Sequence, residues 1–169
     1  MADSALTEDV DRLVGRLAEL ATASGRSIAV AESLTGGQLA AALSAAEGAG
    51  DWFRGGIVAY HPEVKYDLLG APRGPVVTPE TASAMARSAR ELLGADCAAA
   101  LTGVGGPGPD EGKPAGTVYL ATASGSNGDD PDPDVQVDGL HFDGDPIEVI
   151  AQSIEAALTA LIRRLEAHG

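Results

Sequence analysis

Ser33 lies in the first of three short segments whose residue types could do chemistry, the run Ala-Glu-Ser-Leu-Thr-Gly-Gly at 31–37. An apolar stretch typical of a β-strand precedes this run. The two glycines allow the backbone to approach a ligand closely, and free N–H groups at a helix start can hold an anion or an oxyanion. The Ser33 hydroxyl is therefore a candidate nucleophile. The alternative is that Ser33 or Thr35 merely caps the helix that follows.

The second segment, Tyr-His-Pro-Glu-Val-Lys at 60–65, ends in one of the two lysines of a chain that otherwise uses arginine as its cation. A partly desolvated ammonium can lose its proton, whereas a guanidinium cannot, so Lys65 is a candidate general base. The alternative is that Lys65 lies on a short exposed helix and forms a weak surface pair with Glu63 or Asp67. We expect His61, which is next to a proline, to be a surface residue.

The third segment, Thr-Gly-Val-Gly-Gly-Pro-Gly-Pro at 102–109, is a glycine-rich loop. Gly103, Gly105 and Gly108 match the G-x-G-x-x-G pattern, but the dinucleotide-binding fingerprint also needs a helix that begins inside the motif. The residues that exclude a helix here are Pro107, Pro109, Gly112 and Pro114. What remains is a rigid loop with exposed N–H groups, which could line a pocket or bind a phosphate. The second lysine, Lys113, is on this loop.

Hydrophobic periodicity and capping residues predict the elements that must position these segments. The predicted helices are 6–24, 35–46, 62–69, 79–93 and 146–166. The predicted strands are 27–31, 55–60, 97–102, 117–122 and 135–142. Helices that alternate with short apolar strands favour one three-layer α/β/α domain. All three segments would then lie where a strand ends, which is where ligand sites gather in open α/β sheets.

The composition excludes several classes of protein. The chain has 169 residues, 44% of them hydrophobic, and its 25 Asp and Glu against 11 Lys and Arg give a net charge of -14. This apolar content suits a folded domain, and the charge would repel a nucleic-acid backbone. No apolar run approaches the roughly 20 residues of a membrane-spanning helix, and the N-terminus lacks a secretory signal pattern. We therefore expect no nucleic-acid or membrane partner.

The few cysteines and histidines bear on redox compartment and metal binding. The one cysteine, Cys97, excludes an internal disulfide, which fits a cytoplasmic protein, and it is most simply a small buried hydrophobe. No histidine belongs to a cluster with metal-ligand spacing, so we expect no metal site. The Asp-rich stretch 124–134 is expected to be a solvated loop rather than a calcium site.

The three segments, with two further motifs, resemble the CinA C-terminal domain family. The collinear motifs are 31–37, 53–60 with Lys65, 102–108, Pro-x-Gly-Thr-Val-Tyr at 114–119 and His-Phe-x-Gly-Asp at 141–145. Together they cover roughly residues 10–165. The resemblance implies a three-layer α/β/α sandwich around a mixed β-sheet of about five strands, in a single domain over 1–169. Members of the family include nicotinamide-nucleotide amidohydrolases.

The resemblance also implies roles for particular residues. Ser33 matches the family's nucleophile, and Lys65 and Tyr60 match the lysine and tyrosine thought to assist it. The expected chemistry is deamidation of nicotinamide mononucleotide through a serine nucleophile, with no metal or organic cofactor. Residues expected to bind the substrate are Glu32, Thr35, Gly36, Gly37, Thr102, Gly103, Gly105, Gly106 and Lys113. Family members commonly self-associate, so a homo-oligomer is expected.

The chain departs from the family's pattern at two places. Leu34 replaces a cysteine that relatives usually carry between the serine and threonine of the first motif, a change that leaves the chemistry intact. Arginines that commonly follow the Gly-Asp pair are missing, because Gly144-Asp145 precedes Pro146 and no cation occurs before Arg163. This second departure favours the alternative function, a non-catalytic or differently specific relative that binds a nucleotide-like ligand.

Overall fold

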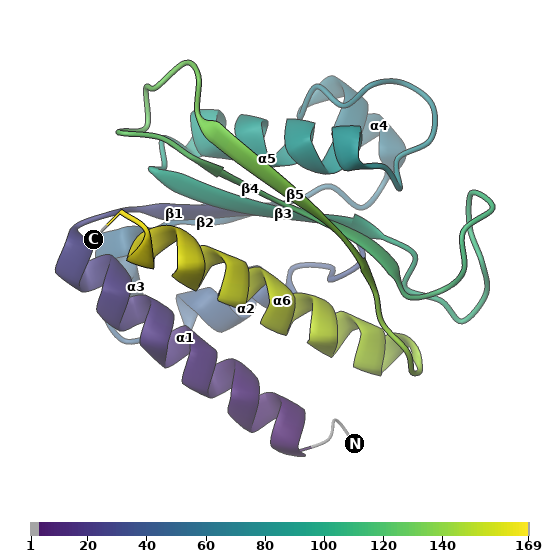
Figure 1. Ribbon diagram of the computed structural model, residues 1–169, viewed down its shortest axis with the longest axis horizontal. Helices are drawn as coiled ribbons and strands as arrows, with labels where there is room; N and C mark the ends of the chain where they lie inside the picture. The colour runs from purple at the N-terminus through teal and green to yellow at the C-terminus, as the bar shows by residue number, and fades with distance from the viewer. Residues whose placement is uncertain (1–3, 169) are drawn as a thin grey trace.

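A computed structural model describes residues 4–168, with side chains from residue 8 onward, so the predicted domain 1–169 includes terminal residues outside the described part (Figure 1). The helices are α1 (Ser4–Ser24), α2 (Gln38–Ser44), α3 (Ala49–Trp52), α4 (Pro62–Asp67), α5 (Pro79–Leu93) and α6 (Pro146–Glu166). The strands are β1 (Ile28–Glu32), β2 (Phe53–Val58), β3 (Cys97–Gly103), β4 (Thr117–Ser124) and β5 (Asp134–His141).

The five strands form one mixed sheet in the order β2-β1-β3-β4-β5. β1 pairs in parallel with β2 and β3, with Ile28 beside Phe53 on one side and beside Cys97 on the other. β3 and β4 pair antiparallel, as do β4 and β5. The predicted mixed five-stranded sheet is therefore confirmed, and three parallel strands bring their carboxyl ends to one edge.

Helices cover both faces of this sheet, which confirms the three-layer sandwich (Figure 1). α4 and α5 lie on one face, and α1, α2, α3 and α6 lie on the other. A hydrophobic cluster rich in leucine and isoleucine fills the space between the sheet and the α1, α2 and α6 layer. A second cluster, built mostly of alanines from α5, β1, β3 and β4, lies on the opposite face. Small side chains on that face let α5 pack close to the strands.

The observed elements differ from the predicted ones near the first segment. α2 begins at Gln38 rather than at 35, because Gly36 and Gly37 have φ values of 57° and 95°, which lie outside the helical region. The short helix α3 was not predicted, since four residues carry too little periodicity to indicate a helix. β2 begins two residues earlier than expected and ends at Val58, which leaves Tyr60 beyond the strand.

Three buried or half-buried arginines hold the far end of the sheet and the acidic loop 124–134. Arg90 donates through Nη1 to the Asp130 carbonyl at 2.9 Å, and Arg26 donates through Nη2 to Ser124 Oγ at 2.9 Å. Arg164 donates to Thr122 Oγ1 at 2.8 Å and pairs with Asp134. The acidic loop is thus anchored by guanidinium groups and is not simply solvated.

Cys97 is fully buried at this same end, as expected for a small hydrophobe. Burial raises the pKa of its thiol to about 11, although the charge of Arg164 opposes the shift.

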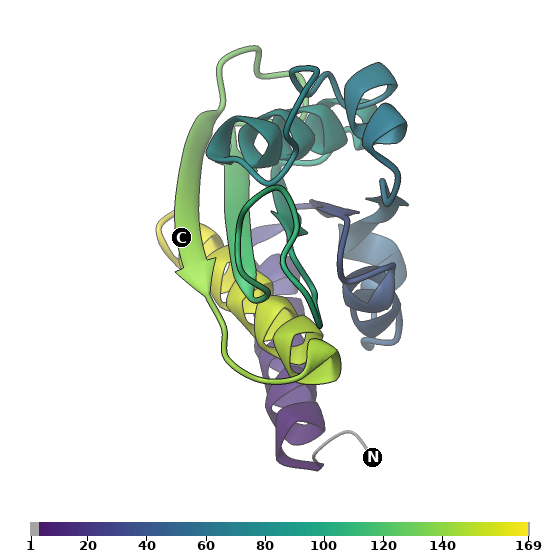
Figure 2. The same cartoon turned by 90° about the vertical axis from the view of Figure 1, so that its right-hand side faces the viewer.

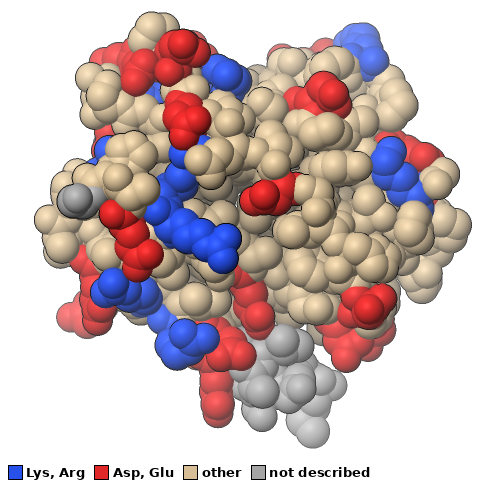
Figure 3. Space-filling model, in the orientation of Figure 1, with Lys and Arg blue, Asp and Glu red and all other residues tan. Residues whose placement is uncertain are grey.

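Acidic and basic side chains are interspersed on the face of the molecule that carries α1 and α6 (Figure 3). Blue Lys and Arg side chains gather over these helices on the left of the view, with red carboxylates between them. The net charge of -14 is therefore not one continuous acidic patch on this face.

Candidate active site

The three segments meet at the carboxyl edge of the parallel strands. Ser33 directly follows β1, Tyr60 and Lys65 follow β2, and the glycine loop begins at the end of β3. Figure 2 looks onto this end of the molecule, where the loop 103–116 stands between the α4 and α5 layer above and the start of α6 below. A pocket of about 410 Å³ lies here. Its lining residues are Ser33, Leu34, Tyr60, Pro62, Lys65, Val76, Val77, Thr102, Gly103, Val104, Gly105, Gly106, Gly108, Asp110, Pro146 and Ile150.

Glu32, and not Ser33 or Thr35, caps the helix that follows the first segment. The Glu32 carboxylate is fully buried and accepts the backbone N–H groups of Leu39 at 2.9 Å and Ala40 at 3.0 Å. A carboxylate at this position also suits the positive end of the helix dipole. Ser33 is 7% exposed, and its hydroxyl makes no hydrogen bond to any residue that the structure describes. The Ser33 hydroxyl is thus left free at the pocket wall.

The Thr35–Gly37 turn, where oxyanion donors were expected, lies outside the pocket lining. The Gly36 N–H donates to the Ser33 carbonyl at 3.0 Å, which closes the turn. Thr35 is fully buried, and its hydroxyl has no partner among the described residues. Glu32, Thr35, Gly36 and Gly37 therefore shape the turn that presents Ser33, and none of them faces the pocket.

Lys65 is buried beside the pocket, so the alternative of an exposed surface lysine is wrong. Its side chain is 1% exposed, and Nζ donates to the Tyr60 carbonyl at 3.2 Å. Burial disfavours the ammonium and lowers the pKa of Lys65, while the negative charge of Glu111 acts in the opposite direction. Glu63 and Asp67 both form salt bridges with Arg73 and not with Lys65.

The other two residues of this segment lie at the surface. Tyr60 is 71% exposed, and it lines the rim of the pocket. His61 is exposed and caps α4, because its Nδ1 accepts the Glu63 N–H at 3.2 Å. The expectation that His61 is a surface residue is confirmed.

The glycine loop forms the third wall and is tied closely to its neighbours. A Cβ on Gly103 would lie 2.6 Å from the Thr117 carbonyl oxygen, so no larger residue fits there. The Thr102 hydroxyl donates to the Val76 carbonyl at 2.8 Å, so it holds two lining segments of the pocket together. Gly105 and Gly106 line the pocket. Lys113, expected to bind substrate, is not among the lining residues.

Glu111 belongs to the site region, although no sequence motif marks it as a candidate. It lies in a tight turn between Asp110 and Lys113, and its carboxylate accepts the N–H groups of Val76 and Val77, both at 2.8 Å. The two valines line the pocket. No local pattern could have identified Glu111, since its partners lie about 35 residues earlier in the chain.

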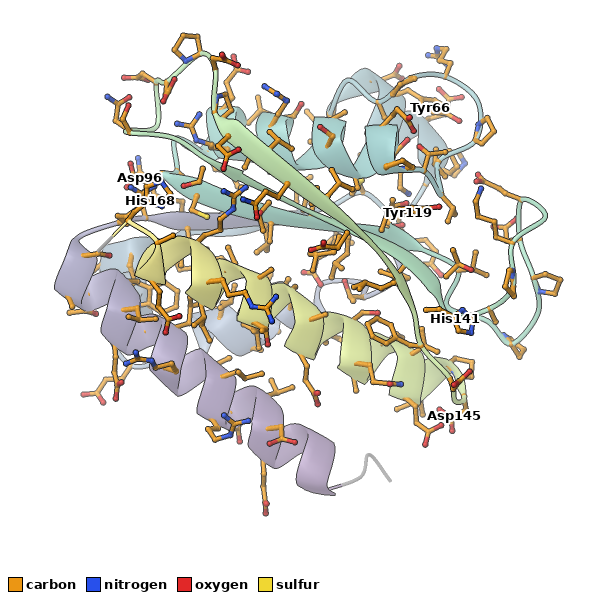
Figure 4. The ribbon with its side chains drawn as sticks, viewed as in Figure 1. Tyr66, Asp96, Tyr119, His141, Asp145 and His168 are labelled. Carbon is orange, nitrogen blue, oxygen red and sulfur yellow. The ribbon has the colours of Figure 1, made fainter. Side chains whose placement is uncertain are left out.

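The start of α6 closes the remaining side through Pro146 and Ile150. Asp145 caps this helix by accepting the Glu148 N–H, while the Glu148 side chain accepts the Asp145 N–H. Figure 4 shows Asp145 and His141 at this end of the sheet, with Asp96 and His168 at the opposite end. Within residues 4–168, no three His, Cys, Asp or Glu side chains gather as metal ligands.

These features define a class: an α/β/α sandwich with a pocket at the carboxyl edge of its parallel strands, lined by a serine and a buried lysine. A family model for the CinA C-terminal domain matches residues 10–165, and the chain belongs to this family. None of the described helices is long and apolar enough to cross a membrane.

Individual relatives agree with this assignment. A CinA-like protein of Geobacter metallireducens is 37% identical over 95% of this chain, and one of Frankia casuarinae is 40% identical over 92%. These matches cover 38% and 35% of the two relatives, so the chain spans less than two fifths of their length. A crystal structure of a CinA superfamily protein from Klebsiella pneumoniae superposes with a TM-score of 0.85 and 32% identity, and the match covers 95% of this chain and 99% of that one.

Proposed function

We propose that this protein is an amidohydrolase that deamidates nicotinamide mononucleotide through Ser33. The observation that carries the proposal is that Lys65 and Ser33 line the same pocket. Lys65 is buried, and desolvation lowers its pKa, while the Ser33 hydroxyl is free. A lysine that loses its proton readily is suited to activate a serine. The pocket of about 410 Å³ lies within the usual range for small-molecule sites.

The proposed reaction needs only groups of this chain and water. Neutral Lys65 takes the proton from Ser33 as Oγ attacks the carboxamide carbon of the pyridine ring, which gives a tetrahedral oxyanion. The ammonium of Lys65 returns the proton to the leaving nitrogen, so the C–N bond breaks and ammonia departs. Water then attacks the acyl-serine ester, and Lys65 relays its proton back to Ser33. The carboxylate product leaves with the enzyme restored.

Backbone N–H groups of the glycine loop are the proposed stabilisers of the oxyanion. Gly105 and Gly106 line the pocket, and aligned backbone donors stabilise such charge strongly in a site screened from water. The Tyr60 hydroxyl, at the exposed rim, is proposed to orient the entering ring.

The test is ammonia release from nicotinamide mononucleotide by the wild type and by Ser33→Ala and Lys65→Met. We expect both substitutions to reduce kcat/KM at least a thousandfold, as removal of a nucleophile or its base does. Ser44→Ala is the matched control, because Ser44 lies exposed on α2 and bonds only its own helix. Thermal unfolding checks that each variant is folded. Normal turnover in either active-site variant contradicts the mechanism.

A second candidate is a relative of different specificity, and the pocket's charges favour it. Among the described lining residues Lys65 is the cation and Asp110 the carboxylate, so the lining offers no excess positive charge to a phosphate. Ammonia release and thermal shifts measured with nicotinamide mononucleotide and its dephosphorylated nucleoside separate the two candidates. Preference for the nucleoside supports the second, and stabilisation without ammonia release supports a non-catalytic binder.

A further inference from the structure

Glu111 holds a backbone conformation that side chains rarely adopt. Its φ is 49°, and it is the one non-glycine residue with a positive φ in the part of the chain described. A residue with a Cβ is strained in this region, and such strain persists where the surroundings compensate it. The side chain of Glu111 therefore contributes something that a glycine in the same turn would not.

The first contribution is a clamp across the pocket wall. Both carboxylate oxygens of Glu111 are used, one on the Val76 N–H and one on the Val77 N–H, each at 2.8 Å. Charge-assisted hydrogen bonds of this kind are stronger than those between neutral groups. The Thr102 hydroxyl holds the Val76 carbonyl from the other side. These bonds join three segments into one wall of the pocket: the short hairpin 110–113 that carries Glu111, the valine segment 76–77, and the end of β3.

The second contribution is charge at the buried lysine. Glu111 is the charged group that acts most on Lys65, and it raises the pKa of Lys65 against the effect of burial. Apart from Glu111 and Lys65, the charged groups of three nearby segments are Glu63 and Asp67 on α4, Asp110 and Lys113 on the hairpin, and Glu32 at the end of β1. Glu63 and Asp67 are exposed and paired with Arg73, and Glu32 is bonded to α2.

We infer that Glu111 is a positioning residue for Lys65: its carboxylate fixes the Val76–Val77 wall to the hairpin and places a counter-charge behind the buried ammonium. Glu111 does not line the pocket, so it acts through the wall and through Lys65, not on the substrate. This role rests on the proposed function, in which Lys65 becomes protonated when it takes the Ser33 proton. The carboxylate of Glu111 then lowers the free-energy cost of the buried ammonium.

The chain offers a direct measurement, because its two lysines give two resolvable signals in a protein labelled with ¹³C at lysine Cε. The titration of Lys65 is followed by NMR in the wild type, in Glu111→Gln and in Glu111→Asp, with Lys65→Met to assign the signal. Glu63→Gln is the matched control, since it removes an equal charge from α4 at a site exposed and paired with Arg73. The pH profile of ammonia release is recorded for the same proteins.

We expect Glu111→Gln to move the Lys65 midpoint and the acid limb of kcat/KM to lower pH, and Glu63→Gln to leave both in place. Glu111→Asp keeps the charge but shortens the clamp, so we expect about a tenfold loss of kcat/KM with the midpoint closer to the wild type. An unmoved Lys65 midpoint in Glu111→Gln, or an equal shift in Glu63→Gln, overturns the inference. If the wild type releases no ammonia, the proposed function fails, while the NMR titration still decides the role of Glu111.

Discussion

Replacement of Glu32 by glutamine tests whether this residue holds the turn or contacts the substrate. The two amide N–H groups at the start of α2 both donate to the buried Glu32 carboxylate. Glutamine keeps the shape but offers one acceptor oxygen, and its NH₂ group then faces a second donor. The isosteric change therefore breaks one hydrogen bond without opening a cavity.

The expected cost follows from these contacts. A hydrogen bond to a charged group contributes about 1.5–3 kcal/mol, and a buried donor left without a partner costs about 1–3 kcal/mol. Because the Glu32 side chain is fully buried, water cannot replace the lost partner. We expect Glu32→Gln to lower the free energy of unfolding by about 2–4 kcal/mol, or roughly 4–16 °C in Tm for a chain of this size. Glu32→Ala, which leaves both N–H groups unpaired, should cost more.

The assay is urea and thermal unfolding, together with KM for ammonia release. Glu47→Gln, at an exposed position after α2, is the control and should stay within about 0.5 kcal/mol of the wild type. A Glu32→Gln protein with wild-type Tm and a raised KM would refute the structural role and support a substrate contact instead.

Four further substitutions bear on stability. Lys65→Met should raise the free energy of unfolding at neutral pH by on the order of 1 kcal/mol, because burial in the native state disfavours the ammonium form that this lysine has in the unfolded chain. The lowered pKa of Lys65 means that the wild type gains stability as the pH rises through the native pKa toward the ordinary lysine value, and the variant should lose this slope in urea titrations. Gly116→Ala should lower the free energy of unfolding by several kcal/mol, because φ is 90° and a Cβ would collide with a carbonyl of the loop after β5. Gly15 faces open space on α1, so Gly15→Ala should raise the free energy of unfolding by about 0.5–1 kcal/mol. Thermal unfolding measures both changes. The hydrogen bond from Arg164 lowers the pKa of Asp134, so Asp134→Asn should weaken the loss of stability that the wild type shows as the pH falls below about 4.

Each of these has a result that contradicts it. Equal pH slopes for wild type and Lys65→Met would mean that the buried lysine does not titrate in the native range. Equal stabilities of Gly116→Ala and Gly15→Ala would show that the loop after β5 yields freely. An unchanged acid profile in Asp134→Asn would assign the acid sensitivity to other carboxylates.

The sequence predicted the layers, because hydrophobic periodicity and end signals are local. The helix at 79–93 begins at Pro79 after Thr78 and ends at Leu93, as its cap and its following glycine indicate. Predictions were weaker where backbone conformation departs from the common regions. The start of α2 moved to Gln38 because two glycines adopt positive φ, which a propensity argument does not detect.

For the site, the sequence alone determined that Ser33, Lys65 and the glycine loop each follow a strand, and with it the expectation of a shared edge. Only the tertiary structure decided what each group does there. In the structure Glu32 caps α2 and Lys65 is buried. Glu111 bonds to the pocket wall from a turn that no sequence motif indicates. The physical reason is that burial and hydrogen-bond partners depend on segments distant in sequence, whereas a strand end is a local property of the chain.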